Sequence, residues 1–266
     1  MTPPAPNIEV MRILLVLLLL PLPAWAGPPP LQLSFAAYVA GFRVFNLQTL
    51  TSMSPDDYHV EVGYRTAGVL ASFFSGDMHS NVQGQFNQMV AQPQRYMSWG
   101  TWFGKGRQTL IDYPEGDPVI RTLVPLVDEA REPVPPEMMP GTVDSLSAVA
   151  MLVHRVTQTG RCEGKVCMFD GRRLSETVAR TGGMEMLEPD HGSAFAGPAL
   201  RCDFVGQQLA GFLLDGDQDR MHRPQQGAAW MAAPAPGLPL MPVRILFPVR
   251  FFGEGTLYLS EIVSRP

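Results

Sequence analysis

The stretch Ser54–Thr66 reads SPDDYHVEVGYRT and indicates the fold class. It opens with Ser-Pro-Asp-Asp, which is a strong turn signal. Apolar and aromatic side chains then alternate with other residues at Tyr58, Val60, Val62 and Tyr64. A period of two residues is typical of a β-strand with one buried face. This segment therefore predicts a turn followed by a strand.

The same alternation continues on both sides of this strand. Leu31, Leu33 and Phe35 alternate with polar residues, and Ala40-Gly41 marks a hairpin turn. Short strands separated by turns, without a regular alternation of strand and helix, indicate an antiparallel barrel or sandwich. Further strands are predicted at His79–Asn87, Arg95–Trp102, Gln108–Tyr113, Val119–Leu126, Ala199–Val205, Ala228–Met231, Pro242–Val249 and Gly255–Ile262.

One segment has helical spacing instead. The proline-rich stretch Glu132–Gly141 is a loop, and Asp144 after it is a suitable helix N-cap. The apolar face that follows, up to Gly160, consists of Leu146, Val149, Leu152, Val153 and Val156. We expect a helix near Asp144–Thr159, with His154 beside its apolar face. The predicted fold is all-β and mostly antiparallel, a large open β-barrel or strongly curved sheet with one covering α-helix.

The N-terminal region reads as a secretory signal. Arg12 precedes the apolar run Ile13–Leu20, and Ala24-Trp25-Ala26 supplies an A-x-A cleavage site. The run is shorter than the ~20 residues of a membrane span. We expect a signal peptide over residues 1–26, of which 1–10 are a misassigned start, and export to the periplasm. A single β-barrel-like domain over residues 27–266, with no membrane span, is expected to remain.

Composition and motif searches limit the partners and the chemistry. Charged residues make up 17% of the chain and the net charge is -5, so no nucleic-acid partner is expected. The histidines have no metal-ligand spacing, and the acidic loop Asp215–Asp219 lacks the glycine and glutamate that complete a calcium loop. We therefore expect no metal or other cofactor. Nucleophile motifs such as G-x-S-x-G are absent, and no catalytic residue is assigned.

Three cysteines are present, Cys162, Cys167 and Cys202. In an oxidising compartment two of them should pair, which leaves a free thiol or an intermolecular link. A bridge between Cys162 and Cys167 would close a hairpin-sized loop. A bridge between Cys162 and Cys202 would close a longer loop and restrain the unfolded chain more. The spacing alone leaves both pairings open.

One polar cluster is a candidate for ligand binding. Asp170-Gly171 has the sequence of a two-residue hairpin turn, and Arg172 and Arg173 would begin the return strand. The same two arginines beside an aspartate would also suit an anionic head group or a glycan. Both interpretations place this cluster at the tip of a hairpin.

Aromatic residues are the second candidate feature. They would line an apolar cavity in a large barrel or pack in its core. The cluster consists of Tyr96, Trp99, Trp102 and Phe103, with Trp230 far along the chain.

An ordered set of short motifs runs through the chain: Tyr38–Val44 (YVAGFRV), Tyr58–Gly68, Gly160–Cys162 (GRC), Phe169–Arg173 (FDGRR), Gly197–Cys202 (GPALRC) and Leu240–Ile245 (LMPVRI). This set resembles the bacterial domain of unknown function 3108, found in exported proteobacterial proteins. The resemblance implies an exported, barrel-like domain. It also implies a disulfide between Cys162 and Cys202, which lie inside matching motifs, with Cys167 left free. Arg65 lies in one of the matching motifs and is added to the candidates from the polar and aromatic clusters. The candidate ligand-binding residues are then Arg65, Trp99, Trp102, Asp170, Arg172 and Arg173.

The function expected from these observations is that of a non-enzymatic periplasmic protein of the cell envelope, which binds an apolar or lipid-like ligand. This expectation is an analogy at the level of the fold. One alternative is a hydrolase or lyase acting on envelope glycans, which needs paired carboxylates. Its nominal candidates are Glu61, Asp112, Asp170 and Asp203. The other alternative is a scaffold that binds an envelope protein partner through exposed sheet edges.

Overall fold

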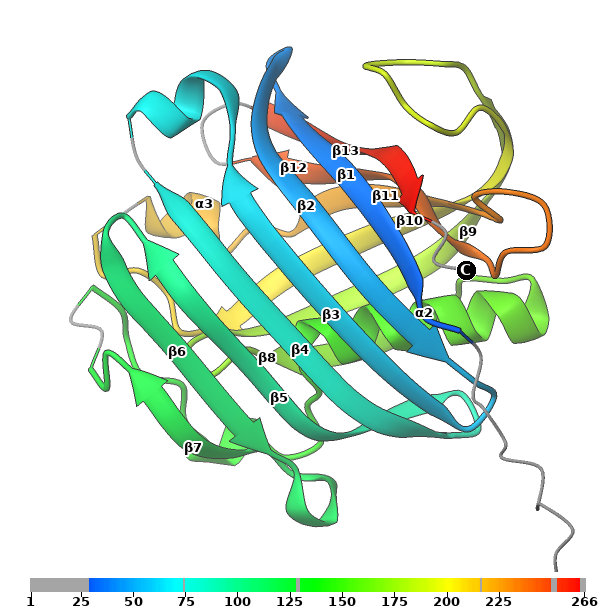
Figure 1. Cartoon of the computed structure of the whole chain (residues 1–266). Helices are drawn as coiled ribbons and strands as arrows, with labels where there is room; N and C mark the ends of the chain where they lie inside the picture. The colour runs from blue at the N-terminus through cyan, green and yellow to red at the C-terminus, as the bar shows by residue number, and fades with distance from the viewer. Residues whose placement is uncertain (1–28, 74, 128–129, 216, 250–252, 264–266) are drawn as a thin grey trace, which may run out of the picture.

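The computed structural model describes residues 29–263 except 74, 128–129, 216 and 250–252. The predicted signal peptide and its cleavage site lie outside these residues. The described chain forms one 13-stranded antiparallel sheet (Figure 1), so the predicted all-β class is confirmed. The strands are β1 (Leu31–Val39), β2 (Phe42–Met53), β3 (Asp57–Thr66), β4 (Gly76–Asn87), β5 (Val90–Trp102), β6 (Lys105–Asp112), β7 (Val119–Val124), β8 (Gly164–Phe169), β9 (Leu174–Leu187), β10 (Gly197–Ala210), β11 (Gln225–Ala232), β12 (Met241–Val249) and β13 (Gly253–Val263).

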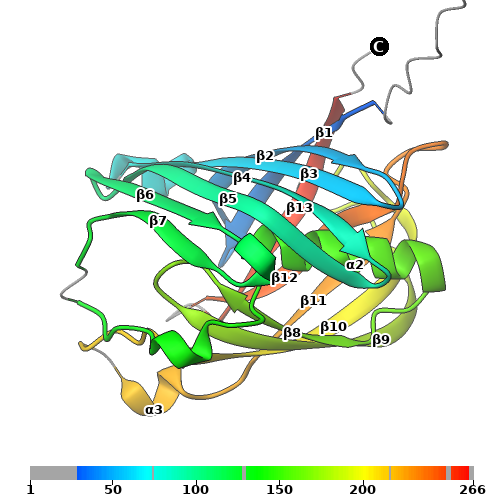
Figure 2. The same ribbon diagram turned by 90° about the horizontal axis from the view of Figure 1, so that it is seen from below.

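The order of the strands in the sheet is β7-β6-β5-β4-β3-β2-β1-β13-β12-β11-β10-β9-β8. Two meanders therefore meet where β1 pairs with both β2 and β13. The sheet curls until β2–β6 face β8–β11 across the interior (Figures 1 and 2). Within the described residues the ladder stays open between its two edge strands, β7 and β8.

Two local contacts lie beside these edges, one on β8 and one at the tip of the hairpin that follows it. The backbone of Val143 donates to the Cys167 carbonyl at 3.0 Å and accepts from the Phe169 amide at 2.8 Å, which extends the sheet beyond β8. On the other side, the tip of the β8–β9 hairpin packs against β6 and β7, because a Cβ on Gly171 would lie 2.7 Å from Thr109 and 3.4 Å from Leu123. The two ends of the curled sheet thus touch at the hairpin tip, while the hydrogen-bonded ladder stays open.

Helix α2 (Ser145–Thr159) lies between the two layers of the sheet (Figure 2). The Asp144 carboxylate accepts from the backbone amides of Leu146 and Ser147, each at 2.9 Å, and so caps the helix. At the other end Gly160 takes the left-handed conformation, with φ 66°. Both ends agree with the sequence prediction. The short helix α3 (Gln218–Met221) and 3₁₀ turns at Gly68–Ser72, Pro114–Gly116 and Pro136–Met138 complete the secondary structure.

The buried face of α2 differs from the prediction. Val149 was expected on the apolar face but is 44% exposed, whereas His154 is only 6% exposed. The His154 ring stacks on Phe86 at 4.0 Å, and its Nε2 lies 3.0 Å from the carbonyl oxygen of Gln88. Contacts with the end of β4 therefore bury His154, which the helical pattern of the sequence had placed beside the apolar face of the helix.

Hydrophobic residues form two clusters, one on each side of α2. Val153 and Val156 of the helix join a cluster with β1, β10–β11 and β13. Ala150 and Met151 join a second cluster with β3–β6 and β8. Burial on two sides of one helix stabilises its position in the interior, since each fully buried large apolar side chain contributes about 1.5–3 kcal/mol.

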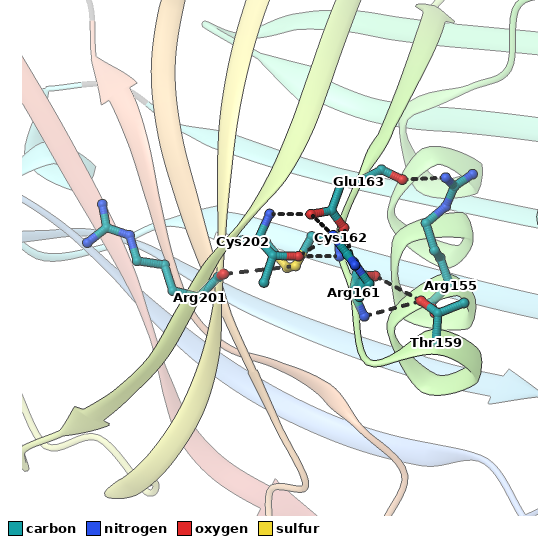
Figure 3. A network of polar contacts seen from close by, with 8 residues as sticks. Arg155, Thr159, Arg161, Cys162, Glu163, Arg201 and Cys202 are labelled. Atoms are coloured by element: carbon teal, nitrogen blue, oxygen red, sulfur yellow. Dashed lines mark hydrogen bonds and ion pairs between the residues drawn. A yellow bond between two sulfur atoms is a disulfide. The ribbon is translucent and has the colours of Figure 1, made fainter.

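Cys162 and Cys202 form a disulfide with a Cα–Cα distance of 5.6 Å, the pairing that the family resemblance implied. It joins the chain just after α2 to the middle of β10 (Figure 3). Neighbouring polar groups hold the same segment, since the Cys162 amide donates to Thr181 Oγ1 at 2.9 Å and Arg161 pairs with Glu163 at 3.2 Å. The end of the helix is thus fixed to the sheet covalently.

Candidate functional site

A cavity of about 640 Å³ lies inside the barrel, between the N-terminal end of α2 and residues of β2–β6. The residues that line it alternate along their strands, as inner-face positions do. Its polar lining includes four arginines, together with serine, threonine and tyrosine hydroxyls on β3–β6. The apolar wall consists of Leu47, Val62, Met78, Trp102, Leu146 and Leu213.

The loop between β8 and β9 supplies the charged end of this cavity. The predicted hairpin is present, and Phe169 pairs with Leu174, so its loop spans Asp170–Arg173. The Asp170 amide donates to the Arg173 carbonyl at 3.2 Å, which places the centre of the turn at Gly171 and Arg172, one residue later than predicted. The Asp170 carboxylate accepts from the backbone amides of Arg172 at 2.9 Å and Arg173 at 2.8 Å. These bonds stabilise the loop, and both arginines line the cavity.

Arg173 and Asp170 form an ion pair within the cavity. The Asp170 Oδ2 atom lies 2.8 Å from Arg173 Nε and 2.7 Å from Nη2, so two guanidinium nitrogens contact the same carboxylate oxygen. Burial would raise the pKa of Asp170, but the charge of Arg173 and the hydrogen bonds outweigh it and lower that pKa. The attraction of Asp170 raises the pKa of Arg173 in turn. Both groups are therefore charged at neutral pH.

Two tyrosines face this ion pair from the opposite wall. Burial raises the pKa of Tyr64, an effect that the charge of Arg173 opposes. Burial also raises the pKa of Tyr96 to about 12, against the hydrogen bonds of Ser80 and Ser98. Both phenols stay neutral at physiological pH. They offer hydrogen bonds to a ligand without adding charge.

Positive charge dominates the described lining of the cavity. Four arginines, Arg107, Arg131, Arg172 and Arg173, line it together with a single carboxylate, that of Asp170. Arg131 Nη1 donates to the Gly211 carbonyl at 2.8 Å, and Arg172 donates to the Pro125 carbonyl. These bonds orient the two guanidinium groups, which keep their charge at any physiological pH. The site is therefore suited to an anionic group.

A second cavity, of about 260 Å³, lies on the other side of α2 against β8–β10. Its lining is almost wholly apolar and includes Met151, Leu152, Met168 and Phe204. Ser145, at the start of α2, lines both cavities. The helix N-terminus therefore separates a mixed polar cavity from an apolar one.

Four of the six predicted ligand-binding residues line the larger cavity, namely Trp102, Asp170, Arg172 and Arg173. The other two lie on the outer face of the sheet. Arg65 is 66% exposed and contacts Asp77 at 3.5 Å. Trp99 stacks on His79 with ring centroids 5.6 Å apart. Alternation along β3 and β5 accounts for this, because Tyr64 and Trp102 are the residues that point inward.

Several lining residues were missed from the sequence, including Tyr64, Tyr96 as a polar group, Arg107 and Arg131. The position of Arg107 could have been found, because Arg107, Thr109 and Ile111 alternate along β6 and the last two are buried. Arg131 lies in a loop that reaches the cavity through its bridge to Leu213. No local pattern indicates such a contact.

A buried polar chain lies at the start of α2, beside the cavity. Asp144 is fully buried, and its carboxylate accepts a short 2.5 Å hydrogen bond from the Ser147 hydroxyl. Tyr58 in turn donates to Ser147 Oγ at 2.8 Å. Burial raises the pKa of Asp144 to about 6, against these hydrogen bonds. The arrangement positions the helix and holds no solvent-accessible nucleophile.

The nominal catalytic carboxylates do not come together. Asp112 lies between Arg95 and Arg121, Asp203 contacts Arg201, and Glu61 contacts His59. Only Asp170 lies in the cavity. Within the described residues there is also no group of three His, Cys, Asp or Glu side chains that could hold a metal ion.

Cys167, the free cysteine, lines neither of these cavities. Its neighbours Val166 and Met168 line the apolar cavity, so Cys167 faces the other side of β8. Its sulfur lies 3.8 Å from Glu176 Oε2, and burial together with that charge raises the pKa of the thiol. A thiol with a raised pKa is a poor nucleophile at neutral pH.

Comparison with known proteins supports the fold and little more. No family model and no curated protein matches the chain. Among solved structures, the chain is similar to a crystal structure of a β-barrel-like protein of the domain of unknown function DUF1849 from Brucella abortus. The two share a TM-score of 0.51 at 10% sequence identity, over 90% of this chain and all of the other. This chain is therefore a β-barrel-like domain in an open, 13-stranded form.

The neighbour agrees with the coarser part of the family resemblance, a β-barrel-like domain of unknown function, but it carries a different family name from domain 3108. Across the described residues, no helix has the length and apolar character needed to cross a membrane.

Proposed function

We propose that this chain is exported to the periplasm and binds an amphipathic, lipid-like ligand with an anionic head group inside the barrel. The observation that carries the proposal is the lining of the larger cavity, which among the described residues combines an apolar wall with four arginines and one carboxylate. An anionic head suits the arginines, because the guanidinium fork matches carboxylate and phosphate oxygens. An acyl or similar apolar portion suits the wall around Leu47, Met78 and Trp102.

The size of the cavity fits this role. Pockets that hold small ligands usually measure about 300–1,000 Å³, and this one measures about 640 Å³. The ligand is bound without reaction, because Asp170 is ionised and already paired with Arg173. Glycoside hydrolysis uses two carboxylates, so a hydrolase or lyase acting on envelope glycans is not favoured.

Export, the single domain over residues 27–266 and membership of domain 3108 belong to the same proposal. Their support is the order Arg12, Ile13–Leu20, Ala24-Trp25-Ala26 and the order of the shared motifs. A disulfide between Cys162 and Cys202 is what an oxidising compartment would allow. N-terminal sequencing of protein recovered from periplasm should begin at Gly27, and an intact Met1 or Met11 would contradict export with cleavage.

The ligand test uses protein purified from periplasm, analysed by native mass spectrometry with lipid extraction. The wild-type chain should carry an anionic lipid. Arg173→Gln should lose it, because this change removes the guanidinium that pairs with Asp170 at the charged end of the cavity. The matched control is Arg65→Gln, since Arg65 is an arginine on the outer face that is 66% exposed.

Thermal melts of both variants check that they fold. A wild-type chain free of lipid would refute the proposal, and so would a folded Arg173→Gln variant that retains its lipid in full. A copurifying protein in place of a lipid would favour the scaffold alternative.

A further inference from the structure

Exposed apolar side chains are concentrated at one end of the barrel. Among the described residues, all large apolar side chains that are at least 58% exposed lie at this end, apart from Met184 and Met186 in β9. Patches of this kind mark interaction surfaces in soluble domains. The side chains concerned, here called the apolar rim, are Phe42, Val69, Phe73, Phe103, Leu126, Val127 and Leu214.

The meander topology gathers these residues. The β1–β2, β3–β4 and β5–β6 connections all fall at the same end of an antiparallel sheet. Phe42 begins β2, Phe73 follows the turn Gly68–Ser72, and Phe103 lies at the β5–β6 turn. Figure 1 shows these connections, with α3, at the upper left of the molecule.

The apolar rim borders the larger cavity. Phe103 follows Trp102, and Leu214 follows Leu213, both of which line that cavity. Leu126 follows Pro125, whose carbonyl accepts from the cavity residue Arg172. On the remaining side, Phe45 near the start of β2 stacks on Trp102 with centroids 6.0 Å apart. A ligand that enters at this end therefore passes the rim.

The arrangement of the rim suits a fluid partner. Its side chains stand on separate loop tips, and three phenylalanines at 60% to 81% exposure protrude from them. A protein partner would need a complementary surface for each protrusion, whereas a bilayer accommodates each one independently. Apolar and aromatic side chains commonly insert at the boundary between head groups and acyl chains.

Charge at the rim is mixed. Arg43 and Lys105 are exposed beside Phe42 and Phe103, while Asp215 and Asp217 follow Leu214. Insertion of apolar side chains must therefore provide most of the attraction to a surface, and such attraction is not screened by salt.

We propose that the apolar rim docks the barrel onto a lipid bilayer, with the larger cavity facing the membrane. This inference rests on the proposed function, since a membrane is the source from which a lipid-like ligand would be taken or to which it would be delivered. Phe73 and Phe103 are the principal inserting residues. They are 81% and 60% exposed on two different connections.

The test is flotation of the full mature chain with vesicles of phosphatidylethanolamine and phosphatidylglycerol. The wild type should float with the vesicles at both low and high salt. The double variant Phe73→Ser/Phe103→Ser should bind at least about tenfold more weakly, because it removes two inserting rings. The matched control is Met184→Ser/Met186→Ser, in which both methionines are 65% exposed but lie outside the rim.

Three results would overturn the proposal: a wild type that stays unbound, equal loss of binding in the methionine control, or a dimer in solution that the phenylalanine variant dissociates. Thermal melts check that each variant folds as the wild type does. Arg173→Gln separates the two proposals, because it should still float with vesicles while losing the cavity ligand. If that variant floats but the wild type carries no ligand, docking stands and the ligand proposal fails.

Discussion

Replacement of Asp144 by asparagine should alter how the stability of the barrel depends on pH. Asp144 is fully buried, and burial raises its pKa from 3.8 to about 6. Between these two values the folded state binds more protons than the unfolded state, so its stability decreases as the pH rises. One pKa unit corresponds to 1.36 kcal/mol, and part of the shift acts below pH 4, so ionisation of the group should cost about 2 kcal/mol of stability between pH 4 and pH 7.

The Asp144→Asn substitution would remove this dependence while keeping the helix cap. The amide oxygen of the new side chain still accepts from the backbone amides of Leu146 and Ser147. Its NH₂ group then donates to Ser147 Oγ, which already accepts from Tyr58, so the serine proton loses its partner. That loss costs about 1 kcal/mol at every pH. Asp144→Ala, which removes the cap as well, should be less stable than Asp144→Asn at every pH.

The assay is urea unfolding of the oxidised protein at pH 4, 5.5 and 7, followed by tryptophan fluorescence. Other carboxylates with lowered pKa values, such as Asp112 and Asp190, contribute the opposite trend. The informative quantity is therefore the free energy of unfolding of Asp144→Asn minus that of the wild type. It should rise by about 2 kcal/mol from pH 4 to pH 7. A difference that stays constant over this range would refute the reasoning.

Three further predictions concern the disulfide, the cavity and the hairpin loop. Cys202→Ser should lower the free energy of unfolding by about 4 kcal/mol, because the bridge closes a separation of 40 residues. Cys167→Ser should change it by less than about 0.5 kcal/mol. Urea melts measure both, and equal losses would contradict the pairing. Trp102→Ala should weaken binding of a fluorescent fatty acid about tenfold, while Trp99→Ala on the outer face should leave it unchanged; equal effects would place the ligand elsewhere. Gly171→Ala should destabilise by about 1–3 kcal/mol, since φ is 92° and its Cβ would meet Thr109 at 2.7 Å. Gly183→Ala, with φ 101° and open space around it, should show the backbone strain alone in the same melts, and a loss as large as that of Gly171→Ala would argue against the contact.

Local patterns in the sequence predicted much of the secondary structure. Both ends of helix α2 were predicted correctly, because Asp144 and Gly160 cap the helix through contacts with their immediate neighbours. Strand β3 was predicted because the pleat of a strand directs successive side chains to opposite faces, and its sequence alternates accordingly. In both cases the determining contacts lie within a few residues.

Contacts between distant segments account for what was not predicted. His154 is buried by Phe86 and Gln88, which lie in and after β4. The candidate site was only partly predicted for a similar reason, since Trp99 and Trp102 are close in sequence but face opposite sides of β5. Arg131 reaches the cavity only through a bridge to Leu213. Alternation along a strand determines which face of the sheet a side chain lies on. Which residue it meets across the barrel depends on how the entire sheet curves.

The central place of β1 has a consequence for the order of folding. Gln32 pairs with Val263, so β1 completes its second ladder only when β13 is available. The strands β2–β7 can pair locally before that, but contacts between such distant residues form slowly. A chain that emerges N-terminus first would therefore hold a half-sheet whose β1 edge is unpaired, and unpaired edges favour aggregation. Protection of that one edge, until the last strand arrives, would govern the yield of folded protein.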